Sequence, residues 1–144
     1  MQTSFTDKQL EDKDNKSSES ILRKCVHCGM CNATWPTFCV NGEELEGPRG
    51  RIYLIKDMLE NKKPANKKVV KHIDSCLSCY SCMTTCPSGV NYMHLIDHGR
   101  NYVEETYKRP FFDRLLRNVL SFVLPRPKVF LVLAYLTKLI KPFS

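Results

Sequence analysis

Apolar residues recur at helical spacing through the middle of the chain. After Pro48 they stand at positions three and four residues apart, and Pro64 ends the pattern. The residues concerned are Ile52, Ile55, Met58 and Leu59. The pattern predicts a helix over residues 49–61 with this stripe in the core.

Similar patterns predict three more helices before residue 108. A short helix is expected at 20–24, a second at 67–75, and a third at 90–107 with Val90, Met93, Ile96 and Val103 on one side. We find no alternation of apolar and polar residues of the kind that half-buried strands require. We therefore predict an all-α fold class.

The last part of the chain is also predicted to be helical. Residues 111–143 form two apolar-rich segments separated by Pro125-Arg126-Pro127. The first has a stripe of Leu115, Leu116, Val119, Leu120 and Val123, and the second contains the unbroken apolar run Val129–Leu136. Neither approaches the roughly 20 apolar residues that a transmembrane helix needs. We expect this tail not to span a bilayer but to pack on something absent from the chain.

The charge of the chain lies almost entirely in this tail. Residues 1–106 contain equal numbers of basic and acidic residues, so the net charge of +7 comes from residues 107–144, where Asp113 is the only acid. Nothing else in the sequence resembles a nucleic-acid-binding motif, and we predict no nucleic-acid partner. A basic and apolar segment is more typical of contact with an anionic membrane surface or with another protein.

The start of the chain is polar. Residues 1–19 contain few apolar residues and lack the apolar core of a signal peptide, so we expect a disordered leader and a cytoplasmic protein, peripheral at most on the inner face of the membrane. The predicted division is a leader at 1–19, a helical domain at 20–108 and the tail at 109–144.

Two runs of cysteine indicate the chemistry. The first run contains Cys25, Cys28 and Cys31, and the second contains Cys76, Cys79, Cys82 and Cys86 followed by Pro87. The second run has the spacing C-x2-C-x2-C-x3-C-P of bacterial iron–sulfur proteins. We therefore predict an α-helical ferredoxin-like domain with two cluster loops, which binds iron–sulfur clusters and transfers electrons.

Zinc and disulfides are the alternatives for these cysteines. A zinc site needs two separated Cys-x-x-Cys pairs, so a third cysteine at the same step is surplus to it. A disulfide framework is disfavoured because thiols inside the cell stay reduced.

The first run has no fourth cysteine, because Trp35 precedes Pro36 where the ligand would stand. In two-cluster ferredoxins the fourth cysteine of each run binds the other cluster. Cys86 would then complete the cluster of the first run, and the cluster of Cys76, Cys79 and Cys82 would lack one ligand. Cys39 is the spare cysteine, and it is either a displaced ligand or a small buried residue. We expect a labile or [3Fe-4S] second cluster.

The remaining polar residues give no sign of substrate chemistry. We find no catalytic triad, carboxylate pair, phosphate-binding loop or dinucleotide motif. His27 lies inside the first run, either as a loop residue that influences the cluster or, less simply, as an iron ligand. His72, His94 and His98 are interpreted as surface or capping residues.

Three segments resemble one known family. They are Cys25–Thr37 (CVHCGMCNATWPT), Gly47–Lys56 (GPRGRIYLIK) and Cys76–Arg100 (CLSCYSCMTTCPSGVNYMHLIDHGR), and the tail RPFFDRLLRNVLSFVLPRP is similar too. Over about residues 20–143 the chain resembles the iron–sulfur subunit of glycolate oxidase, also called glycolate dehydrogenase. Iron–sulfur subunits of glycerol-3-phosphate dehydrogenase, lactate-utilisation proteins and heterodisulfide reductase share these motifs.

The resemblance implies the cofactors, the partners and the role of the chain. Electrons would pass from a flavin in a partner subunit, where glycolate becomes glyoxylate, through two [4Fe-4S] clusters to a membrane quinone or similar acceptor. The family pattern assigns Cys25, Cys28, Cys31 and Cys86 to one cluster and Cys76, Cys79 and Cys82 to the other.

The chain departs from the family at two points. Trp35 replaces a ligand cysteine, and the cysteine-rich C-terminal repeats of the family are missing after Ser144. We therefore expect a truncated chain. A subunit of a related flavin-dependent dehydrogenase, a stand-alone ferredoxin and a zinc module remain as alternatives.

Overall fold

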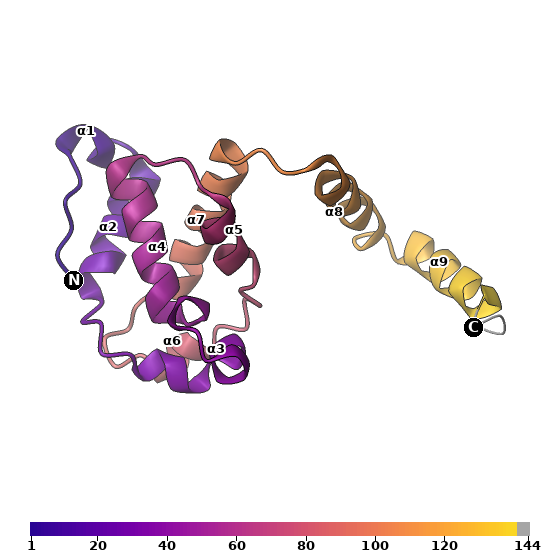
Figure 1. Ribbon diagram of the computed structural model, residues 1–144, viewed down its shortest axis with the longest axis horizontal. Helices are drawn as coiled ribbons and strands as arrows, with labels where there is room; N and C mark the ends of the chain where they lie inside the picture. The colour runs from indigo at the N-terminus through magenta and orange to yellow at the C-terminus, as the bar shows by residue number, and fades with distance from the viewer. Residues whose placement is uncertain (141–144) are drawn as a thin grey trace. The chain divides into compact units, whose positions relative to one another are not determined.

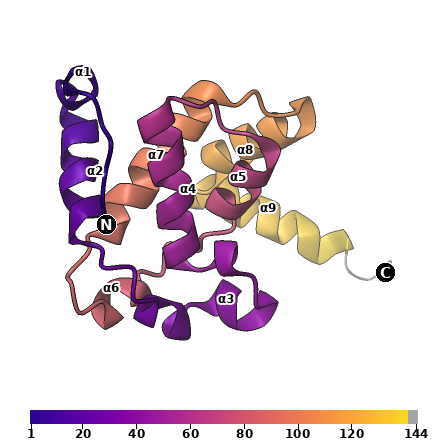
Figure 2. The same ribbon diagram turned by 60° about the vertical axis from the view of Figure 1, so that its left-hand side comes forward.

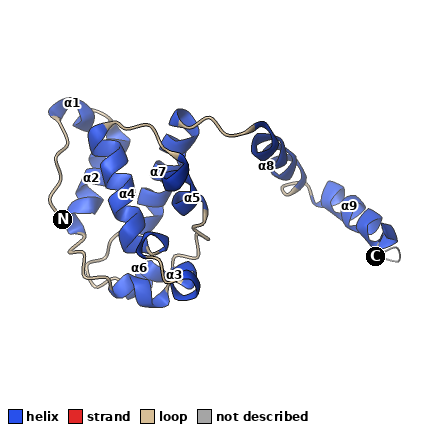
Figure 3. Cartoon of the chain, viewed as in Figure 1, coloured by secondary structure: helices blue, strands red, loops and turns tan. Residues whose placement is uncertain are grey.

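The computed structural model describes residues 1–140, and the surroundings of side chains up to residue 136. Every regular element in this part of the chain is a helix and none is a strand (Figure 3). The predicted all-α fold class is confirmed. The described chain divides into two compact units, the first covering Met1–Tyr107 and the second beginning at Lys108, one residue before the predicted boundary.

The first unit contains seven α-helices and two short 3-10 helices (Figure 1). In chain order they are α1 (Asp7–Leu10), α2 (Lys13–Lys24), η1 (Met30–Thr34), α3 (Pro36–Asn41), η2 (Glu44–Glu46), α4 (Pro48–Asn61), α5 (Lys67–Asp74), α6 (Ser81–Thr85) and α7 (Tyr92–Thr106). The predicted helices at 49–61, 67–75 and 90–107 correspond to α4, α5 and α7.

The core of this unit lies between α2, α4, α5 and α7, and both α4 and α7 contact each of the other three helices. Its apolar residues include Leu22 of α2, Ile55 of α4, Ile73 of α5 and Ile96 of α7, all fully buried. Gly99 of α7 allows α4 and α7 to approach closely, because a Cβ at this position would lie 2.9 Å from Cγ1 of Ile55.

One end of the helical core faces the cysteine loops. The C-terminal end of α2 and the N-terminal ends of α4 and α7 lie toward α3 and α6 in both views (Figures 1 and 2). The first cysteine run connects α2 to η1, and the second connects α5 to α6. Because η1 also contacts α6, the two runs are neighbours in space although they are far apart in the sequence.

The predicted disordered leader is wrong. Residues 7–10 and 13–19 belong to α1 and α2, and Asp12 caps α2 by accepting a hydrogen bond from the Asn15 backbone N–H at 3.1 Å. Gln9 is buried and donates to the Leu59 carbonyl at 2.9 Å. Ser18 is buried against α7, where its hydroxyl is 2.7 Å from Nδ1 of His98. Polar contacts therefore order a segment that has too few apolar residues for the sequence pattern to reveal.

The buried side of α7 also differs from the prediction in one position. Met93 is exposed, while Tyr92, Leu95, Ile96, Gly99 and Val103 are buried. Each of these five residues has another of the set three or four positions away, as expected for one helix face. Val90, Ile96 and Val103 are buried as predicted, whereas Tyr92 takes the place expected for Met93.

The second unit contains α8 (Phe111–Val123) and α9 (Pro127–Ile140), which agree with the two predicted tail helices. Lys141–Phe143, the end of the predicted segment, lie outside the described residues. Large apolar side chains of α8 are exposed, among them Phe111, Phe112, Leu115, Leu116, Val119, Leu120 and Phe122. No single described helix is long and apolar enough to cross a membrane; α8 and the described part of α9 reach that length together, but with a bend of 113° between them.

Candidate metal centre

Five cysteines line one hollow at the loop end of the first unit, and four of them are those that the family pattern assigns to one cluster. Cys25 follows α2, Cys28 lies in the loop, Cys31 is in η1, and Cys86 follows α6. We call this group the first site. Pro48, Ile52 and Val90 also line the hollow and make its surroundings largely apolar. Cys82 of α6 lines the hollow as well, so the structure brings both Cys82 and Cys86 of the second run to the cysteines of the first run.

The electrostatics of the first site suit a metal cluster. Burial raises the pKa of the Cys31 thiol, and the neighbouring Cys25, Cys86 and Cys28 raise it further because a second negative charge is unfavourable there. Cysteine binds iron as the thiolate. The four thiolates of the first site would repel one another, and iron ions among them would stabilise them.

The loop around the first site has an unusual backbone. His27 has φ 62° and Gly29 has φ 82°, so both lie in the left-handed region. The His27 ring packs edge-on against Tyr53, with ring centroids 4.6 Å apart, and it lines the hollow. Its Nδ1 is buried and has no hydrogen-bond partner within the described part of the chain. Burial and the charge of Arg49 lower the His27 pKa, which favours the neutral ring.

Three cysteines form a second site beside the first. Cys76 follows α5, Cys79 lies in the loop and Cys82 is in α6. Burial raises the pKa of Cys82 to about 12, with further contributions from Cys31, Cys76 and Cys79. A hydrogen bond with Ser81, whose Oγ is 3.3 Å from Sγ, lowers the pKa of the exposed Cys79. Cys82 also lines the hollow of the first site, so the two sites adjoin each other.

Trp35, which replaces a cysteine of the ligand pattern, is part of the core. It is fully buried, and its Nε1–H donates to Oγ1 of Thr37 at 2.6 Å. Its ring packs against Tyr92, whose hydroxyl donates to Sγ of Cys76 at 3.8 Å. The place of the missing ligand is therefore filled by an aromatic side chain that contacts the surroundings of the second site.

Cys39, the spare cysteine, lies on α3 and is exposed. Its Sγ donates to the carbonyl oxygen of Ala33 at 3.5 Å. It is not among the residues that line the hollow of the first site. Its role as a displaced ligand remains a prediction that no contact in the described chain supports, and it is not a buried residue either.

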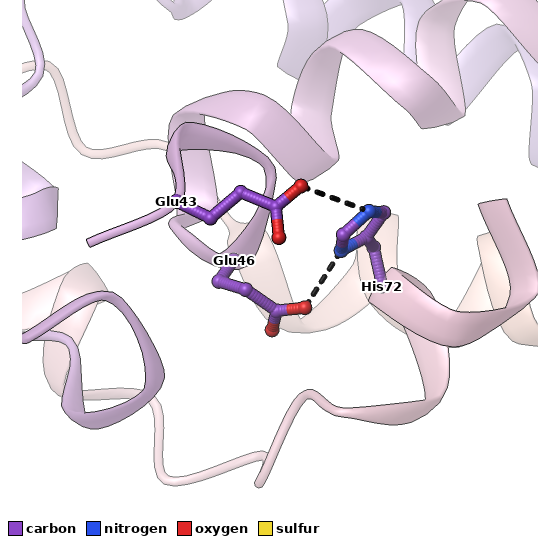
Figure 4. A group of neighbouring side chains, drawn as sticks. All are labelled: Glu43, Glu46 and His72. Carbon is purple, nitrogen blue, oxygen red and sulfur yellow. Dashed lines mark hydrogen bonds and ion pairs between the residues drawn. The ribbon is translucent and has the colours of Figure 1, made fainter. Parts of the chain in front are cut away.

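A buried network of charges lies next to the second cysteine run. Figure 4 shows His72 between Glu43 and Glu46, and its Nδ1 is 2.6 Å from Oε1 of Glu46. Nη2 of Arg51 donates to Oε2 of Glu46 at 2.8 Å and to Oγ of Ser75 at 2.9 Å. His72 is 1% exposed, so its interpretation as a surface or capping residue is wrong. Sequence spacing cannot reveal this pairing because its members come from different helices.

Two carboxylates and an imidazole resemble a cation site, but the network contradicts that reading. Arg51 and Glu46 are both fully buried and already form an ion pair. A metal ion at Glu46 would be repelled by the guanidinium of Arg51. We interpret the group as structural, because it connects η2, α4 and α5 immediately before Cys76.

All eight cysteines, which lie within the described residues, are free thiols. The arrangement has seven cysteines in two adjoining groups, each in a loop at the end of a helical core. Such groups fit metal clusters better than single zinc ions, since the first site adjoins further thiols rather than closing on four ligands alone.

Comparisons with known proteins agree with this geometry. Residues 21–90 match the 4Fe-4S dicluster domain family. The chain is 49% identical over 143 residues to the glycolate oxidase iron–sulfur subunit of Escherichia coli K12, covering 99% of this chain and 35% of that protein. It is 31% identical over 117 residues to the probable glycolate oxidase iron–sulfur subunit of Bacillus subtilis, covering 78% of this chain and 26% of that protein.

A more distant relative has a different substrate in its name. The mitochondrial succinate dehydrogenase iron–sulfur subunit of Candida glabrata is 26% identical over 88 residues, which is 57% of this chain and 35% of that protein. No solved structure matches the chain significantly. The chain spans about a third or less of the length of the curated relatives named here. Residues 21–90 are thus similar to the 4Fe-4S dicluster domain, and the chain is similar to glycolate oxidase iron–sulfur subunits over the part of their length that it spans.

Proposed function

We propose that the chain is the electron-transfer part of a glycolate-oxidising enzyme. The observation that supports this most directly is the hollow of the first site, which five free cysteines from both runs line. A [4Fe-4S] cluster bound there supplies reversible one-electron chemistry. The chain contributes the ligands and an apolar surrounding that limits the access of water.

A second cluster is proposed at Cys76, Cys79 and Cys82. Three thiolates leave one position of a four-iron cluster without a protein ligand, so we expect this cluster to be labile or of the [3Fe-4S] type. The raised pKa of Cys82 adds to this expectation, because a buried thiol surrounded by other thiols gives up its proton less readily. The proximity of the two sites suits electron transfer between them.

The partners of the chain are proposed from its relatives. As a relative of a glycolate oxidase subunit, the chain would receive electrons from a flavin-containing subunit that converts glycolate to glyoxylate, and would itself convert no substrate. A membrane quinone or a similar acceptor would take the electrons. We propose a cytoplasmic location, at the inner membrane surface if the basic tail binds lipid.

A related flavin-dependent dehydrogenase is the second candidate. The likeness to a succinate dehydrogenase subunit supports electron transfer next to a flavoprotein without supporting glycolate in particular. In either candidate function the flavin-containing partner determines the substrate. A stand-alone ferredoxin agrees less well with the exposed apolar residues of α8.

Anaerobic purification of the chain with its flavoprotein partner tests the proposal. We expect bound iron and sulfide, and bleaching of the visible absorbance by glycolate only when the flavoprotein is present. Cys28→Ser should abolish the cluster of the first site, and Cys39→Ser serves as the matched control because both thiols are exposed. Bound zinc without sulfide would contradict the proposal, and reduction by another 2-hydroxy acid or by succinate would favour the second candidate.

A further inference from the structure

Arg49, in the first turn of α4, lies across the loop of the first site. It lines the same hollow as the four cysteines. Its guanidinium packs on Gly29, the residue after Cys28, so closely that a Cβ at Gly29 would be 2.8 Å from Nη1 of Arg49. Glycine is therefore needed at position 29 for two reasons: its backbone is left-handed, and a side chain would collide with the guanidinium of Arg49.

Two polar residues fix the position of Arg49. Its Nε donates to Oε1 of Glu44 at 2.5 Å, and the same oxygen accepts a hydrogen bond from Nδ2 of Asn32 at 3.3 Å. Asn32 is buried directly after Cys31 and packs against Gly47. The cation is thus connected to the cysteine loop on one side and to the start of α4 on the other.

The charge of Arg49 is coupled to the cysteines. The hydrogen bond to Glu44 raises the Arg49 pKa, and Cys31 and Cys28 raise it further. Because Arg49 lines the hollow of the first site and packs on Gly29 beside Cys28, its positive charge stabilises negative charge bound there. Arginine keeps its charge throughout the accessible pH range, so the effect is permanent.

We propose that Arg49 is a positioning residue that raises the reduction potential of the cluster at the first site, and that Glu44 moderates this effect. The proposal rests on cluster binding at the first site, as proposed above. A cluster carries one more negative charge when it is reduced than when it is oxidised. A fixed positive charge beside the ligands therefore favours the reduced state, and a fixed negative charge disfavours it.

The test is a redox titration of the anaerobically purified chain, followed by electron paramagnetic resonance. Arg49→Gln is expected to lower the equilibrium constant for one-electron reduction of the first cluster about tenfold, a fall of about 59 mV in midpoint potential. Glu44→Gln is expected to shift the potential in the opposite direction, because it removes a negative charge and leaves Arg49 in place. Arg49→Lys should keep most of the wild-type potential.

Lys63→Gln is the matched control. This substitution removes one positive charge, as Arg49→Gln does. Lys63 pairs with an acid, Asp57 at 3.0 Å, but it follows the C-terminal end of α4, far from the first site. At 1.5 Å per helical residue the backbones of Arg49 and Lys63 are separated by roughly 20 Å along the helix axis. We expect the reduction potential of the first cluster in Lys63→Gln to equal that of the wild type.

Arg49→Gln and Glu44→Gln change the local charge in opposite directions. They therefore separate an electrostatic effect on the reduction potential from a role of the Arg49–Glu44 pair in supporting the loop. A supporting role would change both potentials in the same direction, or would reduce cluster content in both variants without shifting the potential, and either result overturns the proposal. If Arg49→Gln fails to assemble a cluster, the sign of the shift in Glu44→Gln decides. An absence of any cluster from the wild-type chain would contradict the proposed function instead.

Discussion

The ring of Trp35 packs edge-on against the ring of Tyr92, with centroids 5.6 Å apart and an interplanar angle of 71°. The hydroxyl of Tyr92 in turn donates to Sγ of Cys76. A residue that cannot bind iron therefore stands one side chain away from a cysteine of the second site. This relationship makes the second cluster the point where the chain is expected to differ most from its relatives.

Trp35→Cys tests whether the second site lacks a ligand. We expect the variant to contain two four-iron clusters, because the new thiol supplies the missing position. Without metal the same variant should be about 3–5 kcal/mol less stable, since it removes a large, fully buried aromatic side chain. Iron and sulfide content, electron paramagnetic resonance and urea unfolding measure the two effects separately.

Trp35→Ala is the control for this substitution. It leaves a similar cavity without a thiol, so it should lose stability and gain no iron. If the wild-type chain already contains two intact four-iron clusters, and both survive Cys39→Ala, then three cysteines suffice for the second site and the expectation of a labile cluster is wrong.

Cys86→Ser tests the crossed arrangement of ligands. Cys86 belongs to the second run in the sequence but lines the hollow of the first site. We expect the substitution to abolish the first cluster and to leave the signal of the second largely unchanged. Selective loss of the second cluster, measured by the same spectroscopy, would show that Cys86 binds with its own run.

The crossed arrangement of ligands stays a prediction, but the proximity of the two cysteine runs, which it requires, is found in the structure. The helix α4 could be predicted, since Pro48 begins and Pro64 ends a clear apolar period. Both predictions depend on local geometry and on residue types with few alternative roles.

The contacts of Arg49 and Arg51 could not be predicted in the same way. A charged residue on a helix lies in solvent by default, and spacing does not show which arginine packs on a glycine or enters the core. Arg51 is fully buried because Glu46 and the carbonyl of His72 accept its hydrogen bonds, and these partners come from other elements. Such pairings depend on how the helices pack.

Glu46→Ala tests the buried charge network. The carboxylate accepts from Arg51 and Ser75 and pairs with His72, so its removal leaves a buried guanidinium without its counter-charge. We expect a loss of about 3–5 kcal/mol in the free energy of unfolding. Asp57→Asn, which breaks the exposed pair with Lys63, should cost less than about 1 kcal/mol. Equal losses in the two variants would contradict a special role for the buried pair.

The same network predicts a pH dependence. Burial raises the pKa of Glu46, but hydrogen bonds from Ser75 and His72 and the charge of Arg51 outweigh it, so the pKa lies below the ordinary 4.5. The stability that comes from this shift is fully present above pH 4.5 and is lost as the pH falls through the lower pKa of the folded state. The difference in stability between wild type and Glu46→Gln should therefore shrink below pH 4.5, as measured by urea unfolding at several pH values. A constant difference would contradict the pKa shift.

Removal of residues 109–144 tests the tail. The cysteines of both sites lie in the unit Met1–Tyr107, so we expect iron and sulfide content to remain unchanged. Solubility should rise, because the deletion removes the exposed apolar residues of α8 together with most of the excess positive charge. Loss of both clusters on deletion would instead make the tail part of the core.

Binding assays with the full chain distinguish a membrane contact of the tail from a contact with the flavoprotein. Binding to vesicles of anionic lipid that weakens with salt, without binding to neutral vesicles, is expected if the basic residues meet a membrane surface. Leu116→Gln and Leu120→Gln should weaken this binding at constant charge, because both side chains are exposed on α8. Binding to the flavoprotein alone, lost in the same variants, would assign the apolar residues to a protein interface.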